Sequence, residues 1–365
     1  MSKTLISAAA LTAAVAATAV SLVAAGPADA HSGPAGHHSA PSAHGVTRTD
    51  LVSDQPGKAQ LTDPNLINAW GLSRGPNSPL WVSNAGTSTS TLYSGAVNGG
   101  PATAAPLVVK VPGGPVTGQT FNSSTGFDVP GTTTPASFLF ATVGGTISAW
   151  AGASGTQAVQ AAAVPGAAYT GLTLSSSPFG PLLLAADFHD NRVDVFNSAF
   201  QKLDVAGLFR DPSLPKDYAP FNVQVLGGSV YVTYAKQDAA KQFDVPGAGH
   251  GFVDRFTGYG SFVDRIASRG DLDSPWGLVV APAGFGRFAG DLLVGNFGDG
   301  TIHAFDPAGG RFRGTLTDTR GRTVRIDKLW GLITGDAVAG GPDSVWFSAG
   351  PGDEKHGLLG TLTAQ

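Results

Sequence analysis

The sequence contains no cysteine in 365 residues, and only Glu354 among its 26 acidic residues is a glutamate. Without cysteine the chain cannot be a disulfide-stapled scaffold, and it is long enough to bury a core without cross-links. A single glutamate argues against a large helical protein, because glutamate favours helices whereas aspartate favours turns. These two absences indicate a globular protein built mainly of β-strands.

Charge and recognisable catalytic motifs are also scarce. Charged residues make up 13% of the chain and the net charge is −4, which predicts neither nucleic-acid binding nor a polybasic membrane patch. There is no G-x-S-x-G, H-E-x-x-H or Walker loop. The glycine-rich stretch at 296–300 lies between predicted strands rather than before a helix, so it does not predict a phosphate site. No reaction class follows from motifs.

Residues 1–30 have the pattern of a secretory signal peptide. Lys3 is followed by an apolar run over 5–25 and by a small-x-small cleavage site, Ala28-Asp-Ala. An uncleaved membrane anchor is the alternative, because the run is nearly long enough to span a bilayer. No later run of membrane length follows, so cleavage after Ala30 would release the mature chain. We therefore expect a secreted, extracellular protein with no transmembrane segment after signal cleavage.

Residues 31–45 form a stretch rich in histidine, glycine, proline and serine with almost nothing apolar to bury, which predicts a disordered linker. It contains four of the eight histidines: His31, His37, His38 and His44. Short histidine tracts can bind copper, zinc or nickel. A solubilising linker without metal is the competing interpretation.

From residue 46 onward, a pattern of short strands recurs six times. The units begin near residues 69, 125, 169, 220, 274 and 329, and their opening strands align on Gly71, Gly126, Gly171, Asn222, Gly277 and Gly331. A repeat of roughly 50 residues is the period of a propeller blade rather than of a solenoid coil. The sequence therefore predicts that 46–365 is a single all-β domain, a six-bladed β-propeller of four-stranded blades.

The last unit ends too early to supply its own fourth strand. Each unit has a nearly continuous apolar second strand, as at 292–295, and a third strand that often ends on an aromatic residue. The sixth unit reaches Gln365 after its third strand. We expect an N-terminal strand at about 47–53 to complete the last blade, which would close the ring and remove exposed sheet edges.

One face of this ring is predicted to gather the polar loops. Strand direction alternates within a blade, so the loops joining second to third strands share a face with those entering each blade, at 63–68, 119–122, 211–217 and 271–274. The candidate ligand-binding residues on this face are Asn84, Asp187, His189, His250, Asn296, Asp353 and His356. If the side-chain oxygens converge on the axis, they would suit Ca²⁺, and additional histidines would suit Zn²⁺ or Cu²⁺. The tentative metal ligands are Asp187, Asn296 and His189. Ordinary turn capping is the alternative.

Other features of the same face each have two interpretations. The loop at 235–250 is either a lid over the channel or an insertion. Trp70, Trp276 and Trp330 begin three opening strands, where they either stack on a flat ligand or pack between blades. His303, on a third strand, is expected to be a packed strand residue.

Several segments resemble a family of secreted bacterial propeller proteins without an established activity. They are Leu51-Val-Ser-Asp, Thr62-Asp-Pro-Asn-Leu-Ile-Asn-Ala-Trp-Gly, Tyr231-Val-Thr-Tyr-Ala-Lys-Gln, Ser274-Pro-Trp-Gly-Leu and Leu293-Val-Gly-Asn-Phe-Gly-Asp-Gly. Some members of that family carry a C-terminal PEP-type sorting signal, which is not visible here. The repeat is more distantly similar to NHL-type six-bladed propellers. The resemblance implies the fold, and it supplies no functional residues.

Two functional hypotheses follow. The first is a secreted, monomeric binding module that uses one loop face and the central funnel for an extracellular protein, glycan or small molecule. The second is a divalent-metal-dependent hydrolytic enzyme of the lactonase or lyase kind, with the metal in the funnel. The lack of glutamate near the blade entries weakens the enzyme hypothesis, because such relatives typically use a glutamate ligand.

Overall fold

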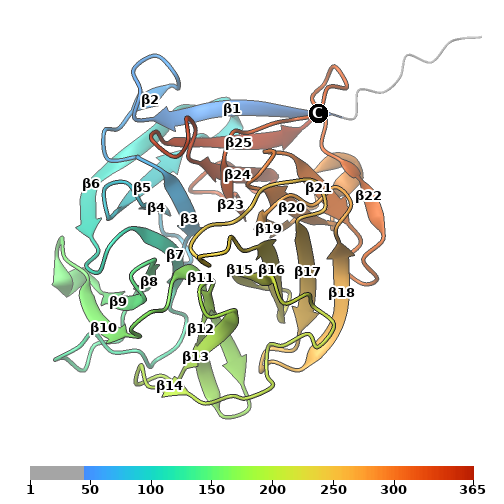
Figure 1. Cartoon of the computed structure of the whole chain (residues 1–365). Coiled ribbons are helices and arrows are strands. Elements are labelled where there is room, and N and C mark those ends of the chain that lie inside the picture. Colours follow the sequence, from blue (N-terminus) through green and yellow to red (C-terminus); the bar gives the residue numbers. More distant parts are fainter. Residues whose placement is uncertain (1–44) are drawn as a thin grey trace, which may run out of the picture. The chain divides into compact units, whose positions relative to one another are not determined.

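The structure is a computed structural model, and it describes residues 45–365. Six sheets radiate from a central axis, and each sheet is one blade (Figure 1). The fold is the all-β six-bladed β-propeller that the repeat predicts. The predicted signal peptide and the candidate linker ligands His31, His37, His38 and His44 lie outside the described residues.

The two strands nearest the axis in each blade are largely buried. The inner strands, in blade order, are β3 (Ala69–Ser73), β7 (Val116–Phe121), β11 (Tyr169–Ser177), β15 (Tyr218–Leu226), β19 (Pro275–Val280) and β23 (Leu329–Thr334). The second strands are β4 (Leu80–Asn84), β8 (Phe138–Thr142), β12 (Gly180–Asp187), β16 (Ser229–Lys236), β20 (Leu292–Asn296) and β24 (Ser344–Ala349). The apolar runs in the sequence thus correctly predict the second strands.

The third strands are also mostly buried, whereas the outer strands face solvent. The third strands are β5 (Thr89–Gly95), β9 (Thr146–Trp150), β13 (Arg192–Phe196), β17 (Gly251–Phe256), β21 (Ile302–Phe305) and β25 (Leu358–Ala364). Outer strands of the first five blades are β6 (Ala102–Lys110), β10 (Val159–Ala163), β14 (Lys202–Leu203), β18 (Phe262–Ser268) and β22 (Phe312–Thr315). Helical structure within 45–365 is limited to 3-10 turns at Val97–Gly99, Gly152–Ser154 and Gly286–Phe288, and none could cross a membrane.

The N-terminal strand closes the ring. Strand β1 (Val46–Ser53) pairs antiparallel with β25, from Val46 opposite Ala364 to Ser53 opposite Leu358. The short β2 (Leu61–Thr62) then adds to β1 in parallel. The last blade therefore combines both ends of the propeller domain, as the early end of the sixth repeat predicts (Figure 1).

Apolar side chains fill each junction between neighbouring blades. Separate buried clusters lie at the six junctions, and a seventh lies on the axis. Between the first two blades, for example, the ring centroids of Trp81 and Phe138 stack 4.1 Å apart. Because burial of apolar surface contributes about 25 cal/mol per Å², each blade is stabilised mainly by its neighbours.

The inner strands approach one another at a ring of six equivalent residues. These ring residues are Gly71, Gly118, Gly171, Asn222, Gly277 and Gly331, and each faces the next blade. A Cβ on Gly277 would lie 2.6 Å from the Trp330 carbonyl oxygen, which is too close for any side chain. Asn222 fits because its Nδ2 donates to the Trp276 carbonyl at 2.8 Å.

The second blade begins earlier than the sequence pattern predicts. Its inner strand starts at Val116, so the predicted start near 125 is wrong, and Gly118 rather than Gly126 is the ring residue. Residues 125–129 instead belong to the long connection between β7 and β8, where Phe127 is buried and its N–H donates to the Ser198 carbonyl at 2.8 Å. Residues 119–121, predicted to be part of an entry loop, accordingly lie in β7.

Candidate functional site

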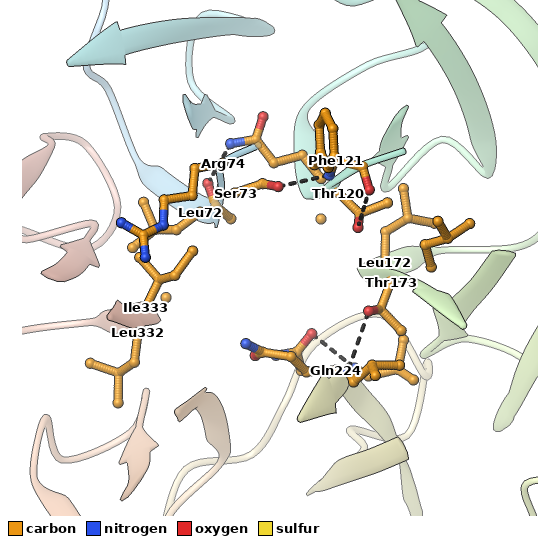
Figure 2. Close-up of a pocket in the computed structure, with 18 of the residues that line it drawn as sticks. Leu72, Ser73, Arg74, Thr120, Phe121, Leu172, Thr173, Gln224, Leu332 and Ile333 are labelled. Carbon is orange, nitrogen blue, oxygen red and sulfur yellow. Dashed lines mark hydrogen bonds between the residues drawn. The ribbon is translucent and has the colours of Figure 1, made fainter. Parts of the chain in front are cut away.

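A pocket of about 300 Å³ lies on the propeller axis. In five blades it is lined by inner-strand residues at or just after the ring residue, and the fifth blade contributes Trp276 (Figure 2). Its lining includes Arg74, Ser123 and Ile333, which lie at or near the ends of inner strands. The pocket is therefore close to the loops that join inner to second strands. We call that side of the propeller the hairpin face, and the opposite side, where each blade begins, the entry face.

Four blades present a polar side chain to the pocket at the same position. Each lies two residues after its ring residue, on the same side of the strand, because side chains alternate with a period of two. These residues are Ser73, Thr120, Thr173 and Gln224, whereas the fifth and sixth blades have Val279 and Ile333 there. The pocket therefore has a polar wall from four consecutive blades and an apolar wall from the sixth, which contributes Leu332 and Ile333.

Hydrogen bonds between blades hold these walls in place. Ser73 Oγ accepts from the Phe121 N–H at 2.8 Å, and Thr173 Oγ1 accepts from the Val225 N–H at 3.3 Å. Each inner strand is the edge of its sheet, so its outward N–H groups would otherwise lack partners. The side chains of one blade thus satisfy the backbone of the next, and these bonds fix the shape of the pocket wall.

Among residues 45–365, Arg74 is the only ionisable side chain that lines the pocket. Its Nη1 lies 2.7 Å from Asp336 Oδ2, and its Nη2 donates to the Gly335 carbonyl at 3.1 Å. Burial lowers the pKa of Arg74, while attraction to Asp336 opposes that shift. The guanidinium stays charged at neutral pH, because arginine remains protonated in proteins.

The entry end of the channel is filled by aromatic side chains. Trp330 stacks on Trp70 with ring centroids 3.6 Å apart and on Phe297 at 4.0 Å, and all three are buried. Trp330 Nε1 also donates to Asn68 Oδ1 at 2.9 Å. Trp276 meets the same cluster edge-on, and it also contributes to the lining of the axial pocket.

Three of the predicted funnel residues are fully buried and form hydrogen bonds to nearby strands and loops of the same blade. Asn84 Nδ2 donates to Thr91 Oγ1 at 3.0 Å, and Asn296 Nδ2 donates to the Asp271 carbonyl at 2.8 Å. Asp187 Oδ1 accepts from the backbone N–H groups of Ala168 and Asp190, and burial raises its pKa to about 6. These contacts are of the kind that turn capping involves, while Asn84 Oδ1, Asp187 Oδ2 and Asn296 Oδ1 are buried without a hydrogen-bond partner in the described domain.

The histidines among the candidates are likewise held by local partners. His189 Nδ1 lies 3.0 Å from Asp190 Oδ1, and His250 Nδ1 lies 2.7 Å from the Val245 carbonyl. His356 Nδ1 lies 2.9 Å from Asp54 Oδ2, a residue that follows β1 at the outer edge of the last blade. Asp353 is exposed in the same loop as His356.

The structure does not gather these residues into a metal centre. Among residues 45–365, no group of three or more histidine, aspartate or glutamate side chains is arranged to hold a metal ion. His303 is buried on β21 between Thr301 and Thr315, as expected for a packed strand residue. The loop at 235–250 folds on itself and is tied to the next blade, where the Gly247 N–H donates to Asp273 Oδ1 at 2.7 Å.

The pocket residues were missed because they lie inside strands rather than in loops. A sequence signal for them exists: a polar residue follows the ring residue by two positions in the first four repeats. Using that signal requires the correct ring residue of the second blade, Gly118, since Thr120 is found only from that alignment.

Fold and site together define the class, a β-propeller with a preformed axial pocket. The uncharacterized protein R648 of Acanthamoeba polyphaga mimivirus is 32% identical over 322 residues, which cover 86% of this chain and 78% of that protein. The chain belongs to the same family as that protein. Proteins L690 and R640 of the same virus also match, at 36% and 29% identity, but the chain spans only 51% and 36% of their lengths.

These relatives do not support the bacterial origin that the resemblance implied, because they are viral. No family model matches the sequence. Among solved structures, an α-L-arabinofuranosidase from Fusarium graminearum aligns with a TM-score of 0.52 and 11% identity, over 87% of this chain and 98% of that one. A protein of unknown function from Bacteroides thetaiotaomicron aligns with a TM-score of 0.52 and 12% identity, over 88% of this chain and 76% of that one. At such identities the similarity concerns the fold alone.

Proposed function

We propose that this protein is a binding module that holds a small polar molecule in the axial pocket, entered from the hairpin face. The observation that carries the proposal is a preformed cavity of about 300 Å³ with polar side chains from four blades pointing along its wall. A concave site with a few fixed polar groups among apolar ones is the usual form of a small-molecule site.

The size of the pocket narrows the partner classes expected from the sequence. A volume of about 300 Å³ accommodates a small molecule or the terminal residue of a glycan, but not a folded protein segment. Thr120, Thr173 and Gln224 offer hydrogen-bonding groups, while Leu332 and Ile333 offer apolar contact. Such a combination suits a ligand with both hydroxyl groups and a carbon skeleton.

A thermal-shift screen with a pocket-blocking variant tests this proposal. Residues 45–365 would be screened against monosaccharides, polyols, sugar acids and amino acids. We expect at least one class to raise the melting temperature, because binding only to the native state stabilises it. Thr120→Trp, which fills the pocket, should abolish that shift. Thr103→Trp, an exposed threonine on outer strand β6, is the matched control and should preserve it.

Ligands whose shift survives Thr120→Trp would place binding elsewhere and contradict the proposal. The proposal is also contradicted if no compound in any class stabilises the wild-type protein.

Metal analysis separates this proposal from the metal-dependent lactonase or lyase hypothesis. Because residues 45–365 contain no arranged group of three metal-binding side chains, we expect EDTA to leave their melting temperature and ligand binding unchanged. A stoichiometric divalent ion in the purified domain, lost on Asp187→Ala or Asn296→Ala, would favour the enzyme hypothesis instead.

We also propose that the chain functions outside the cell after signal cleavage. The support is the charged start, apolar run and Ala28-Asp-Ala site of the sequence. Expression of the full chain in a secreting host should release a product whose N-terminal residue is His31. A product that stays in the membrane fraction with Met1 intact would refute this proposal.

A further inference from the structure

The charge of the axial pocket is carried by one side chain. Of the residues that line it, only Arg74 is ionisable, and none is acidic. The Arg74 side chain is 19% exposed, so most of its surface has been removed from water. A partly desolvated cation on the wall of a small cavity attracts an anionic group more strongly than the same cation on an open surface.

The counterion of Arg74 lies outside the pocket wall. Asp336 does not line the pocket, and its Oδ1 accepts from the Val338 and Ala339 N–H groups at 2.8 Å each. Its other oxygen, Oδ2, contacts Arg74 Nη1. Asp336 is thus fixed by its own turn, and it orients the guanidinium from behind without occupying the cavity.

The guanidinium retains capacity for a second anionic partner. Within residues 45–365, the polar contacts of Arg74 involve Nη1 and Nη2 and leave Nε–H without a partner. Arginine presents five N–H donors in a planar fork, so it can bind a second carboxylate while keeping its first. Because Arg74 and Asp336 together carry no net charge, a monocarboxylate leaves the site with one excess negative charge, whereas a dianion would leave two.

The opposite side of the pocket is uncharged and carries the polar side chains of Thr173 and Gln224 among apolar ones. Figure 2 shows Arg74 across the cavity from Leu172 and Thr173, with Gln224 between the two sides. No hydrogen bond joins the Gln224 amide to another residue of the described domain, and the Thr173 hydroxyl has spare donor capacity. These groups are placed to bind hydroxyls at the far end of a ligand whose acidic end meets Arg74.

We infer that the pocket takes a hydroxylated monocarboxylate of monosaccharide size, a sugar acid, with its carboxylate on Arg74 and its hydroxyls toward Thr173 and Gln224. This inference rests on the proposed function, because it concerns the same pocket. It adds the chemical class of the ligand, and no covalent step is involved.

Calorimetric titration of the domain with matched sugars tests the inference. Glucuronate, glucose and glucose 6-phosphate would be titrated separately, since they share a ring and differ in charge. We expect glucuronate to bind about 10- to 100-fold more tightly than glucose, because a charge-assisted pair replaces a neutral contact. Added salt should weaken the binding of glucuronate and leave the affinity for glucose unchanged.

Arg74→Met removes the charge while keeping an apolar stem of similar length. We expect this variant to reduce glucuronate affinity to that of glucose and to leave glucose affinity unchanged. Arg313→Met is the control, because Arg313 forms a comparable ion pair with Asp291 at 3.3 Å on the fifth blade, away from the axis. If Arg74→Met does not fold, the wild-type comparison of the three sugars and its salt dependence still decide the question.

The failure of the inference differs from the failure of the proposed function. Equal or tighter binding of glucose, or unchanged glucuronate affinity in folded Arg74→Met, overturns the sugar-acid assignment while leaving the pocket as a binding site. Preferential binding of glucose 6-phosphate assigns the pocket to phosphate esters and likewise overturns it. Absence of any ligand sensitive to Thr120→Trp refutes both.

Discussion

Gly277 has no room for a side chain, because the backbone of the next inner strand lies where its Cβ would be. Gly331 is similarly constrained, since a Cβ there would lie 2.9 Å from the Trp70 carbonyl oxygen. At the scale of single residues, these contacts set how tightly six strands can surround the axis. They explain why glycine recurs in the repeat, a fact that the sequence displays but does not by itself interpret.

Substituting a ring glycine should therefore destabilise the whole ring. We expect Gly277→Ala to cost about 1–3 kcal/mol, because the neighbouring backbone must move to relieve the overlap. Gly309→Ala in the same blade, with nothing within 4 Å of its Cβ position, is the control. Chemical denaturation compares the two, and an equal loss in both variants would contradict the role assigned to the ring.

Asp254 is a buried carboxyl whose charge state should govern part of the pH dependence of stability. It lies 3.1 Å from Arg265 Nε, yet burial raises its pKa to about 7. Because the unfolded value is about 3.9, the folded state binds the proton more tightly. The stability from this group is complete below about pH 4 and is lost as pH rises through about 7.

Asp254→Asn isolates that contribution. Relative to the wild type, the variant should become progressively more stable between about pH 4 and 7, because its own side chain does not ionise. Unfolding free energies measured at several pH values test this expectation. A difference between the two proteins that stays constant over this range would show that Asp254 is not protonated in the folded state.

At the scale of elements, strand β1 joins the two ends of the propeller domain. Its residues from Val46 to Ser53 pair with β25, and Leu51 and Val52 belong to the core between the last and first blades. Removing β1 would expose the edge of β25 and open one of the six blade junctions. The ring should therefore depend on this strand more than on any outer strand of comparable exposure.

Deleting residues 45–53 should cause a large fall in melting temperature and a loss of cooperative unfolding. A chain that begins at residue 45 is the matched control and should unfold in one sharp transition. A peptide spanning 45–53, added in trans, should restore part of the loss. A truncated chain as stable as the control would contradict the closure role of β1.

The sequence predicts elements well where one blade is sufficient to define them. The second strands are continuous apolar runs, and the early end of the sixth repeat required a strand from the other terminus. The start of the second blade could not be predicted in this way. Residues 125–129 resemble an opening strand in sequence, whereas the actual inner strand, Val116–Phe121, lacks a Trp-Gly-Leu motif. The pocket was also missed, since Ser73, Thr120 and Thr173 meet only when several blades surround one axis.

At the scale of the whole molecule, the two ends of the channel differ. Trp70, Trp330 and Phe297 fill the entry end, whereas polar side chains leave the hairpin end open as a pocket. The predicted funnel residues Asn84, Asp187 and Asn296 form hydrogen bonds to nearby strands and loops around the filled end. This asymmetry is the reason for placing the proposed small-molecule site at the hairpin face, although the abundance of polar loops on the entry face suggested the reverse.

A crystal structure of residues 45–365 with the most stabilising small molecule tests this account most directly. The account places the ligand in the axial pocket, with polar atoms within hydrogen-bonding distance of Thr120, Thr173 or Gln224. Ligand bound over the entry-face loops that carry His189, His250 and Asp353, with the axial pocket empty, would contradict it.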